Sequence, residues 1–544
     1  MRSSTRPPRQ KQERGLALIG VVGLLLVFLV FAGAMITQLA NELNSTKMAT
    51  VSNRAIAAAD AGVHAMVEQI QTDLDLRQPL PTSPITYAYP EPGASPAAES
   101  YSVTVDGPYP AQGLNYYLIT SIGTYNNGIE NISRRVRAIA KGVPISDYAS
   151  FSNYEVNQYG NPVWYLSSQH FNGPVYSGGP MRIAYASPSP TVTPIFGASV
   201  QTGNVPVWSP CDPTTCGGWS SVSAGGSGSF SVNSTALSLP QPQDNIAVAS
   251  YAYEGDGLMA TYPAVAAGVY IDGSTSGGKD AASTTSPIDT TGIYINVGSS
   301  GTATITSTVS GNTDTLKIYG PWAGAYQVTI NYTAFNSSGD CSGSTTVTHG
   351  TATHTFSGTP CGAPGPGVTN PGNGAIFSNG NIQLGNGGQR DTILEGDYSL
   401  VTPDYSGYAN DITLLGNLFY DPGSATYDKT ALWANNVILA SNTITGLTVD
   451  SAIIAGYPGE SWSSGYFKNN RCNKTGCGSG SQGILNINGS LVENARGAVG
   501  EVIGGIQYGF ARVINFDSRF ATAPPPFNPT TGALQIIAWE DLGQ

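Results

Sequence analysis

The longest apolar segment of the chain lies close to its N-terminus. Leu16 to Ile36 are 21 consecutive residues without a charged side chain. As a helix rising about 1.5 Å per residue, this segment is roughly 30 Å long, the thickness of a bilayer's hydrocarbon core. Basic residues precede it, with Glu13 as the only acid among them: Arg2, Arg6, Arg9, Lys11 and Arg14. The basic side is expected to stay cytoplasmic at the inner membrane, so the rest of the chain is predicted to be extracytoplasmic.

The apolar segment continues into a predicted amphipathic helix. From Thr37 to about Arg77 the chain has no proline and one glycine, Gly62. Apolar residues follow the spacing of one helix face: Val63, Met66, Val67, Ile70 and Leu74. Pro79 and Pro81 end the pattern. One helix is therefore predicted over 16–78, apolar first and amphipathic later.

Three interpretations of this N-terminus remain open. A cleaved secretory signal would use Ala32-Gly33-Ala34, although its apolar core is usually only about 7 to 15 residues long. A plain membrane anchor is the second. The third is a type IV prepilin, with residues 1–15 as the leader and cleavage between Gly15 and Leu16. An apolar half that runs without a break into an amphipathic half favours the third.

Residues 12–70 resemble the PilX-type minor pilins. The pattern consists of an apolar run after a glycine, here Arg14-Gly15-Leu16-Ala17, and of Ala58-Ala59-Asp60-Ala61-Gly62, where aspartate replaces the usual glutamate. The resemblance implies cleavage after Gly15 by a prepilin peptidase, methylation of Leu16, and a role in a type IV pilus or pseudopilus. It also implies other pilins and the pilus assembly machinery as partners.

One departure from the pilin pattern concerns the position five residues into the mature chain. Major pilins carry a glutamate there, whereas this chain has Gly20. A buried carboxylate is costly unless a partner charge compensates it, as a neighbour's N-terminal amine is thought to do in those pilins. A subunit without it fits the tip of a filament better than its middle, so we expect a role in priming assembly or in presenting an adhesive head.

Strand patterns follow a Pro/Ala/Ser-rich linker at 79–98. Alternation over Tyr101–Val105, and then over 116–123 and 134–141, predicts a small pilin-like sheet at 99–142. Three arginines lie on its last strand: Arg134, Arg135 and Arg137. They are interpreted as a solvated strand face, with a patch for DNA or acidic polymers as the alternative.

An internal repeat points to a β-solenoid. Residues 172–183 match residues 373–384 at an offset of 201, and each copy contains two short strands around a Ser-x-Gly turn. Apolar clusters recur after the second copy, mostly at the spacing of parallel β-helix coils: Ile376, Leu394, Leu414, Ile438, Ile454 and Leu485. We predict a first β-solenoid segment at 143–200, a Ser/Thr/Gly-rich β insertion at 201–370, and a β-helix with a C-terminal tail at 371–544.

Most of 373–540 also resembles an uncharacterised family of extracytoplasmic domains that follow PilX-like stems. The matching motifs, in chain order, begin at Asn373-Gly374, Asn410-Asp411, Ile487-Asn488, Arg496-Gly497 and Phe516-Asp517, before Pro524-Pro525-Pro526. That resemblance implies a surface or pilus-linked role and no catalytic chemistry.

Composition agrees with a secreted β protein. Charged residues make up 11% of the chain, against roughly 25% in average soluble domains. The net charge of −12 argues against specific nucleic-acid binding, which requires a basic surface. A surface glycan, or a host or abiotic surface, is a more plausible partner for the head.

The cysteines form three local pairs, which outside the cytoplasm indicate disulfides: Cys211 with Cys216, Cys341 with Cys361, and Cys472 with Cys477. Sequence alone leaves their connectivity open. A zinc site built from the two C-x4-C pairs is the alternative, but no histidine lies near enough in the sequence to support it. We expect no metal and no cofactor.

Candidate catalytic chemistry is sparse. The sequence lacks the P-loop, H-E-x-x-H, G-x-S-x-G and EF-hand motifs. His349 and His354 would point to opposite faces if they shared one strand. A polysaccharide lyase or glycosidase is the main enzymatic alternative, and its acids would come from Asp391, Glu395 and Asp397. We expect no catalytic residues and no enzyme activity.

The expected fold class is mainly β, with a long N-terminal pilin-like helix and a β-rich head that contains a parallel β-helix and an inserted β-rich region. The alternative to a pilin role is a membrane-anchored surface β-helix that binds or cleaves polysaccharide without entering a filament.

Overall fold

The computed structural model describes residues 11–543 apart from these segments: 77–84, 90–98, 112–113, 127–130, 167–168, 186–193, 211–229, 233–236, 238, 240–241, 254–260, 272–291, 299–300, 336–340, 360–372, 404–408, 424–426, 441–444, 458–459, 479 and 504–505. The fold is mainly β with a long N-terminal helix, as the sequence predicted. Two compact units can be distinguished: residues 1–108, 117–140 and 536–544 form the first, and residues 109–116 and 141–535 form the second.

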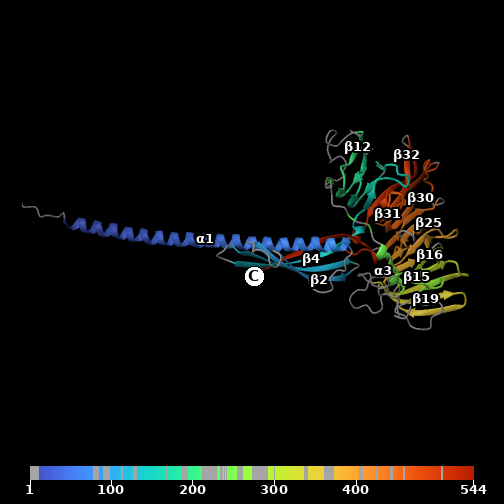
Figure 1. Ribbon diagram of the computed structural model, residues 1–544, viewed down its shortest axis with the longest axis horizontal. Coiled ribbons are helices and arrows are strands. Elements are labelled where there is room, and N and C mark those ends of the chain that lie inside the picture. Colours follow the sequence, from blue (N-terminus) through green and yellow to red (C-terminus); the bar gives the residue numbers. More distant parts are fainter. Residues whose placement is uncertain are drawn as a thin grey trace, which may run out of the picture. The chain divides into compact units, whose positions relative to one another are not determined.

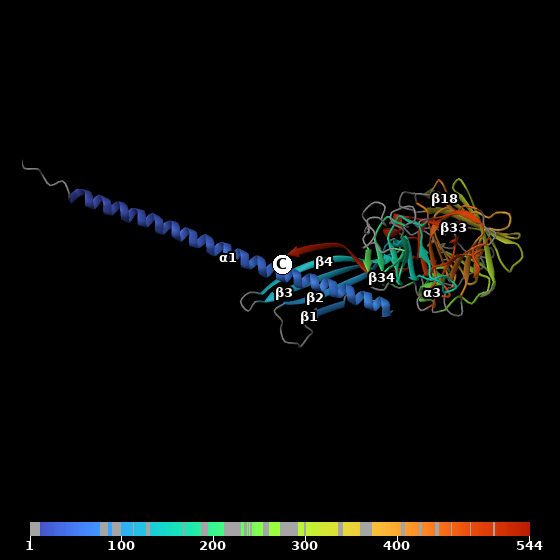
Figure 2. The same ribbon diagram turned by 90° about the horizontal axis from the view of Figure 1, so that it is seen from above.

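The first unit contains α1 (Lys11–Leu76) beside a five-stranded sheet (Figure 2). The strand order is β1 (Ile85–Tyr89), β2 (Glu99–Ala111), β3 (Leu114–Asn126), β4 (Asn131–Pro144) and β34 (Thr530–Gly543). The sheet predicted from 99–142 is thus completed by one strand from the linker region and by the last strand of the chain, neither of which its local pattern had assigned to it.

The side-chain exposure of helix α1 changes along its length. Residues 18–50 are exposed, and burial begins at Val51. The buried stripe includes four of the five predicted face residues, Val63, Met66, Val67 and Ile70, whereas the side chain of Leu74 lies outside the described residues. One helical turn after another therefore places these residues against the sheet, as the i, i+3, i+4 spacing requires.

Small residues bring α1 close to the sheet. A Cβ on Gly62 would lie 2.9 Å from Tyr101 Cδ2 and closer still to Ser121 Oγ. A Cβ on Gly123 of β3 would lie 2.8 Å from Ala59 Cα. The Ala-Ala-Asp-Ala-Gly motif is therefore part of a tight helix–sheet contact, which any larger side chain would push apart.

The second unit is built on a continuous parallel ladder. In spatial order its strands are β15 (Gly292–Asn296), β21 (Ala375–Ser378), β24 (Asp397–Val401), β27 (Lys429–Ala434), β29 (Leu447–Ala455), β31 (Ser481–Ala495), β5 (Ser150–Tyr154), β8 (Val175–Ser177), β11 (Val200–Thr202) and β13 (Phe230–Val232). The segment 150–202 thus extends the ladder beyond β31 instead of preceding β21.

Other parallel pairings follow the same progression. One series pairs β23 (Thr392–Leu394), β26 (Leu418–Tyr420) and β29, and another pairs β31, β33 (Ile506–Phe516), β7 (His170–Phe171) and β10 (Ile195–Phe196). On another face, β16 (Thr302–Ser310), β22 (Asn381–Leu384), β25 (Asp411–Leu414), β28 (Asn436–Leu439) and β30 (Phe467–Asn469) succeed one another (Figure 1). A smaller parallel sheet has the order β12 (Val207–Pro210), β9 (Arg182–Tyr185), β6 (Trp164–Tyr165).

Antiparallel strands and short helices flank these parallel ladders. The strand β14 (Gly268–Tyr270) pairs with β15, and β32 (Gly500–Ile503) pairs with β33. A meander continues from β16 through β17 (Thr313–Tyr319), β18 (Ala325–Phe335), β19 (Cys341–His349) and β20 (Ala352–Ser357). Short helices complete the unit: η1 (Ile145–Asp147), α3 (Pro242–Tyr253) and η4 (Ser518–Ala521).

The predicted insertion at 201–370 is therefore not a separate body in its described parts. Residues of β15 and β16 pair in parallel with β21 and β22, so 292–295 and 302–305 belong to the same parallel ladders. Helix α3, which the sequence analysis did not predict, packs against β15 and β21.

Side chains that lie in register on successive parallel strands form two continuous buried rows, which stabilise the second unit. The interior row includes Ile293, Ile376, Leu400, Leu432, Ile453 and Leu491. A neighbouring outer row is apolar or aromatic throughout, each residue at most 1% exposed: Tyr294, Phe377, Val401, Trp433, Ile454, Val492, Phe151 and Tyr176. Helix α3 and nearby loops cover the outer row, which is why both faces of these strands are buried.

The apolar clusters chosen from the sequence do not form a single row. Leu394 lies in β23, Leu414 and Ile438 lie in another sheet, and Ile454 belongs to the outer row. The interior row instead advances from Ile376 by 24, 32, 21 and 38 residues. Each turn of chain contributes strands to more than one face, so the sequence pattern mixed positions that face different ways.

Candidate ligand-binding cleft

The predicted processing site lies within α1. Gly15 and Leu16 are helical, and nothing is described of their side chains. The helix over Leu18–Gln71 is long and apolar enough to cross a membrane, with a peak mean hydropathy of 2.8. The structure thus contains the membrane-compatible helix that the apolar run predicted, while cleavage and methylation remain predictions.

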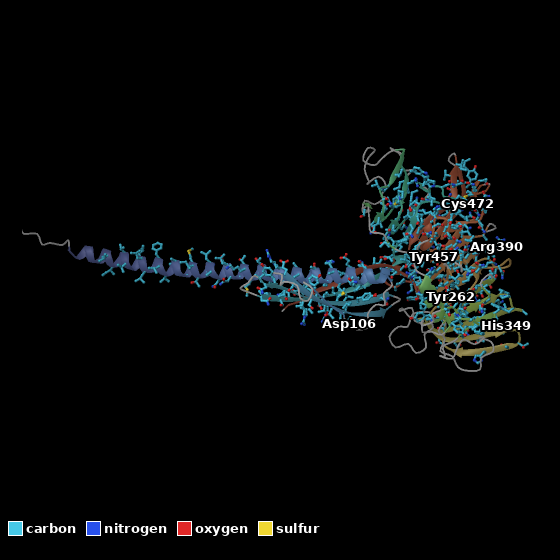
Figure 3. The ribbon with its side chains drawn as sticks, viewed as in Figure 1. Asp106, Tyr262, His349, Arg390, Tyr457 and Cys472 are labelled. Atoms are coloured by element: carbon cyan, nitrogen blue, oxygen red, sulfur yellow. A yellow bond between two sulfur atoms is a disulfide. The ribbon has the colours of Figure 1, made fainter. Side chains whose placement is uncertain are left out.

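One of the three predicted cysteine pairs is a disulfide in the structure. Cys472 and Cys477 are bonded, and both are nearly buried. They follow β30, beside which Figure 3 labels Cys472. Cys211, Cys216 and Cys361 lie outside the described residues, as does the side chain of Cys341. Those two pairs therefore remain predictions.

The three acids considered for catalysis have separate roles. The Asp391 carboxylate accepts hydrogen bonds from the Asn417 backbone and side chain at 2.8 and 3.0 Å. Asp397 forms an ion pair with Lys429 at 3.0 Å, and its burial raises its pKa to about 6. Glu395 is buried, which together with the charges of Asp421, Asp428 and Asp314 raises its pKa to about 8.

Neither the histidines nor the acids form a metal centre among the described residues, where no group of three possible ligands converges. His349 ends β19 and His354 lies in β20, so the two do not share a strand. The His349 ring stacks on Tyr326 with centroids 3.9 Å apart. This pair has a packing role at that position.

The arginines of β4 are partly neutralised by the last strand. Arg134 forms an ion pair with Asp541, and Arg137 forms one with Glu540 at 3.4 Å. Two of the three basic side chains thus have acidic neighbours that only the tertiary structure supplies. The solvated-face interpretation fits these pairs better than a free basic patch does.

A cleft of about 410 Å³ opens on the second unit. Its walls come from two distant parts of the chain, 157–169 and 472–512. The parallel pairings of β31 with β5 and of β33 with β7 bring these parts together. The Cys472–Cys477 disulfide and the β32–β33 hairpin form one side. The volume falls in the usual range of roughly 300 to 1,000 Å³ for small-molecule sites.

Two buried guanidinium groups line this cleft. Arg496 is 1% exposed, and its Cζ lies 4.3 Å from the centroid of the Tyr165 ring. Arg512 is 5% exposed and donates to Glu493 Oε2 at 3.3 Å and to the Gly497 carbonyl at 3.0 Å. Arginine at this depth is rare unless it is paired.

Two buried glutamates balance these charges. Glu155 Oε2 lies 3.8 Å from Arg496 Nη1, and Glu155 Oε1 accepts a 3.0 Å hydrogen bond from the Tyr165 hydroxyl. Glu493 Oε1 accepts from the backbone N–H groups of Phe467 and Gly497. Burial opposes the charge of Arg496, but Tyr165, Glu155 and Glu493 raise its pKa overall. Burial and the charge of Arg496 lower the pKa of Arg512.

No local sequence pattern predicts this cleft. Arg496-Gly497 stands out in the sequence only as a motif shared with a resembling family, and no predicted site contains Glu155, Tyr165 or Trp164. The available signal was a pair of arginines in a chain with few charges, one directly after β31 and one within β33. The contact of Arg496 with Glu155 depends on a pairing across more than 300 residues of chain.

No protein-family model matches the chain, and no curated protein sequence matches it. A solved structure, the competence-associated pilin ComZ from Thermus thermophilus, aligns over 91% of this chain and 98% of its own, with 13% identity and a TM-score of 0.29. Likeness at that TM-score carries no argument about fold or function.

Proposed function

We propose that this chain is a minor-pilin-like structural protein of the PilX type. It is inserted in the inner membrane with its N-terminus cytoplasmic, cut after Gly15 by a prepilin peptidase, methylated on Leu16, and assembled with other pilins by the pilus machinery. Its β-rich head is extracytoplasmic, and its task is to prime assembly or to present that head at a filament tip.

The observation that carries this proposal is the two-part design of α1. Its first half exposes apolar side chains such as Leu25, Phe28 and Leu29, which are 59, 64 and 73% exposed. Its second half is fitted to a sheet through Ala59 and Gly62. A helix that only anchored a protein would need no such fitted second half. Gly20 supports placement at the tip, where no neighbour must compensate a buried carboxylate.

We further infer that the second unit is a parallel β-helix, supported by its successive parallel pairings and stacked amide side chains. Asn488 donates to Asp450 at 2.7 Å, Asn515 to Asn488 at 2.9 Å, and Asn172 to Asn515 at 3.2 Å. Such amide ladders form where identical turns are stacked one strand spacing apart. The head then serves as a binding or structural body, without catalysis and without nucleic-acid specificity.

The test is the exact mass of the N-terminal peptide of the protein from native membranes and from sheared surface material. A chain that begins at Leu16, with or without a methyl group, supports the proposal. An intact Met1 end would make it an anchored surface protein that never enters a filament. A start beyond Ala34 would make it a secreted protein.

A pair of variants sharpens this test. Gly15→Val places a β-branched side chain at the bond to be cut and should leave the chain uncut and absent from surface material. Gly20→Val is the matched control, because a Cβ at Gly20 meets nothing within 4 Å. Equal cleavage of both variants would contradict processing at Gly15.

A further inference from the structure

The guanidinium of Arg496 has more hydrogen-bond donors than the protein uses. Among the described residues, none of its three nitrogens has a hydrogen-bond partner, and Arg512 Nε has none either. Glu155 Oε2 lies near enough to balance the charge but, at 3.8 Å, too far to accept a hydrogen bond. The charge of Arg496 is therefore balanced, but in the described part of the chain its N–H groups have no acceptor at hydrogen-bond distance, and Glu155 Oε2 likewise has no donor.

An acceptor in the cleft would remove a real energetic cost. Leaving a buried polar group without a hydrogen bond is destabilising, and more so when the group is charged. The planar guanidinium carries its N–H groups in a fork that matches a carboxylate in bidentate fashion. A carboxylate is thus the group whose geometry best suits Arg496.

The side chains that line the cleft indicate the chemistry of the rest of the ligand. Tyr159 and Trp164 offer flat, partly apolar surfaces. Amide side chains lie among them: Asn157, Asn161, Gln169 and Gln507. A ring with apolar faces and hydroxyl groups around its edge matches such a mixture of aromatic and amide groups.

A peptide ligand fits this cleft less well. Extended peptides usually gain affinity by adding a strand to an exposed sheet edge. Two short edge strands border this cleft among the described residues, β6 with Trp164 and Tyr165 and β32 with Gly500–Ile503. Neither is long enough to pair with an extended peptide along its length.

We propose that the cleft binds a sugar ring that carries a carboxylate, with the carboxylate on Arg496 and the ring against Trp164. This inference rests on the adhesive part of the proposed function and not on cleavage or filament assembly. Binding without cleavage after Gly15 would overturn the pilin proposal alone, and cleavage without binding would overturn this one alone.

The test uses the full-length protein in detergent micelles, titrated by calorimetry with a trimer of galacturonic acid and with a trimer of galactose at equal ionic strength. We expect the acidic trimer to bind at least about tenfold more tightly, a difference of about 1.4 kcal/mol. Equal affinity for the two trimers, or no binding of either, would overturn the proposal. Competition by acetate at the same concentration as the acidic trimer would do so too, since the ring would then contribute nothing.

Variants locate the binding. Arg496→Lys keeps the charge but loses the fork, so it should weaken binding of the acidic trimer about tenfold, with Arg390→Lys outside the cleft as its control. Because Arg496 is buried, Trp164→Ala is a second variant, with Trp539→Ala at an exposed position of β34 as its control. An unchanged urea midpoint shows that each variant is folded. Wild-type affinity in folded Trp164→Ala would contradict the assigned site.

Discussion

Gly123 of β3 lies so close to Ala59 of α1 that a Cβ on the glycine would fall 2.8 Å from the Ala59 Cα. Real Cβ atoms do not approach backbone this closely, so the helix and the sheet can meet here only through a glycine. Ala59 is the second alanine of the Ala-Ala-Asp-Ala-Gly motif, and the contact gives that motif a physical meaning: it keeps one face of α1 small enough to lie on the sheet.

Gly123→Ala should loosen α1 from the sheet. Overpacking of this kind typically costs about 1 to 3 kcal/mol, because the opposing atoms belong to helix backbone and cannot rotate away. Hydrogen exchange of the amides of residues 55–70 should speed up by a factor of about 5 to 150. Gly387→Ala is the control, since a Cβ there meets nothing within 4 Å. Unchanged exchange in Gly123→Ala would mean that the helix does not depend on this contact.

Truncation within the outer row should destabilise the second unit. Trp433 is 1% exposed and lies in register between Val401 and Ile454. Trp433→Ala should lower the free energy of unfolding by about 3 to 5 kcal/mol, through lost burial and the cavity left behind. Urea unfolding measures this loss. Trp462, at 42% exposed, is the matched position, and a similar loss in Trp462→Ala would argue against a special role for the row.

Stability of the second unit should fall as the pH rises from about 5 to 8. Burial, followed by the charges of Asp421, Asp428 and Asp314, raises the pKa of Glu395 to about 8, and burial raises the pKa of Asp314 to about 7. Between the ordinary and the raised pKa the folded state holds protons that the unfolded state has lost. The free energy of unfolding therefore decreases with pH in this window.

Glu395→Gln removes one of these titrating groups without changing its size. The variant should show a flatter dependence of its urea midpoint on pH between 5 and 8 than the wild type does. Asp391→Asn is the control at a neighbouring acid. A wild-type midpoint that rises over this range, or an unaltered slope in Glu395→Gln, would contradict the role assigned to the buried carboxyl.

The Cys472–Cys477 disulfide should shape the cleft more than it holds the unit together. Closing so short a loop is expected to contribute about 2 kcal/mol by restricting the unfolded chain, and the buried rows of the stack do not include either cysteine. The double variant Cys472→Ser/Cys477→Ser should remain folded in urea titrations. Binding of the galacturonic acid trimer should weaken, because the loop forms one wall. Unaltered affinity would show that this wall is dispensable.

Local patterns were sufficient for the helix and for the fold class. Val63, Met66, Val67 and Ile70 predicted a buried face because helix periodicity depends only on residues a few positions apart. The repeat at 172–183 and 373–384 likewise predicted two short consecutive strands in each copy. These are β8 and β9 in the first copy and β21 and β22 in the second. What these patterns could not convey was the order in which the copies stack.

By itself, the sequence determined a long apolar helix, a β-rich remainder and a close Cys472–Cys477 pair, because each depends on neighbouring residues. Only the tertiary structure decided that β5 follows β31, that β34 joins the sheet beside α1, and that Arg496 meets Glu155 and Tyr165. Strand partners are chosen by burial and register between distant segments, and many segments of this chain have similar apolar patterns. The cleft exists only where those choices bring 157–169 against 472–512.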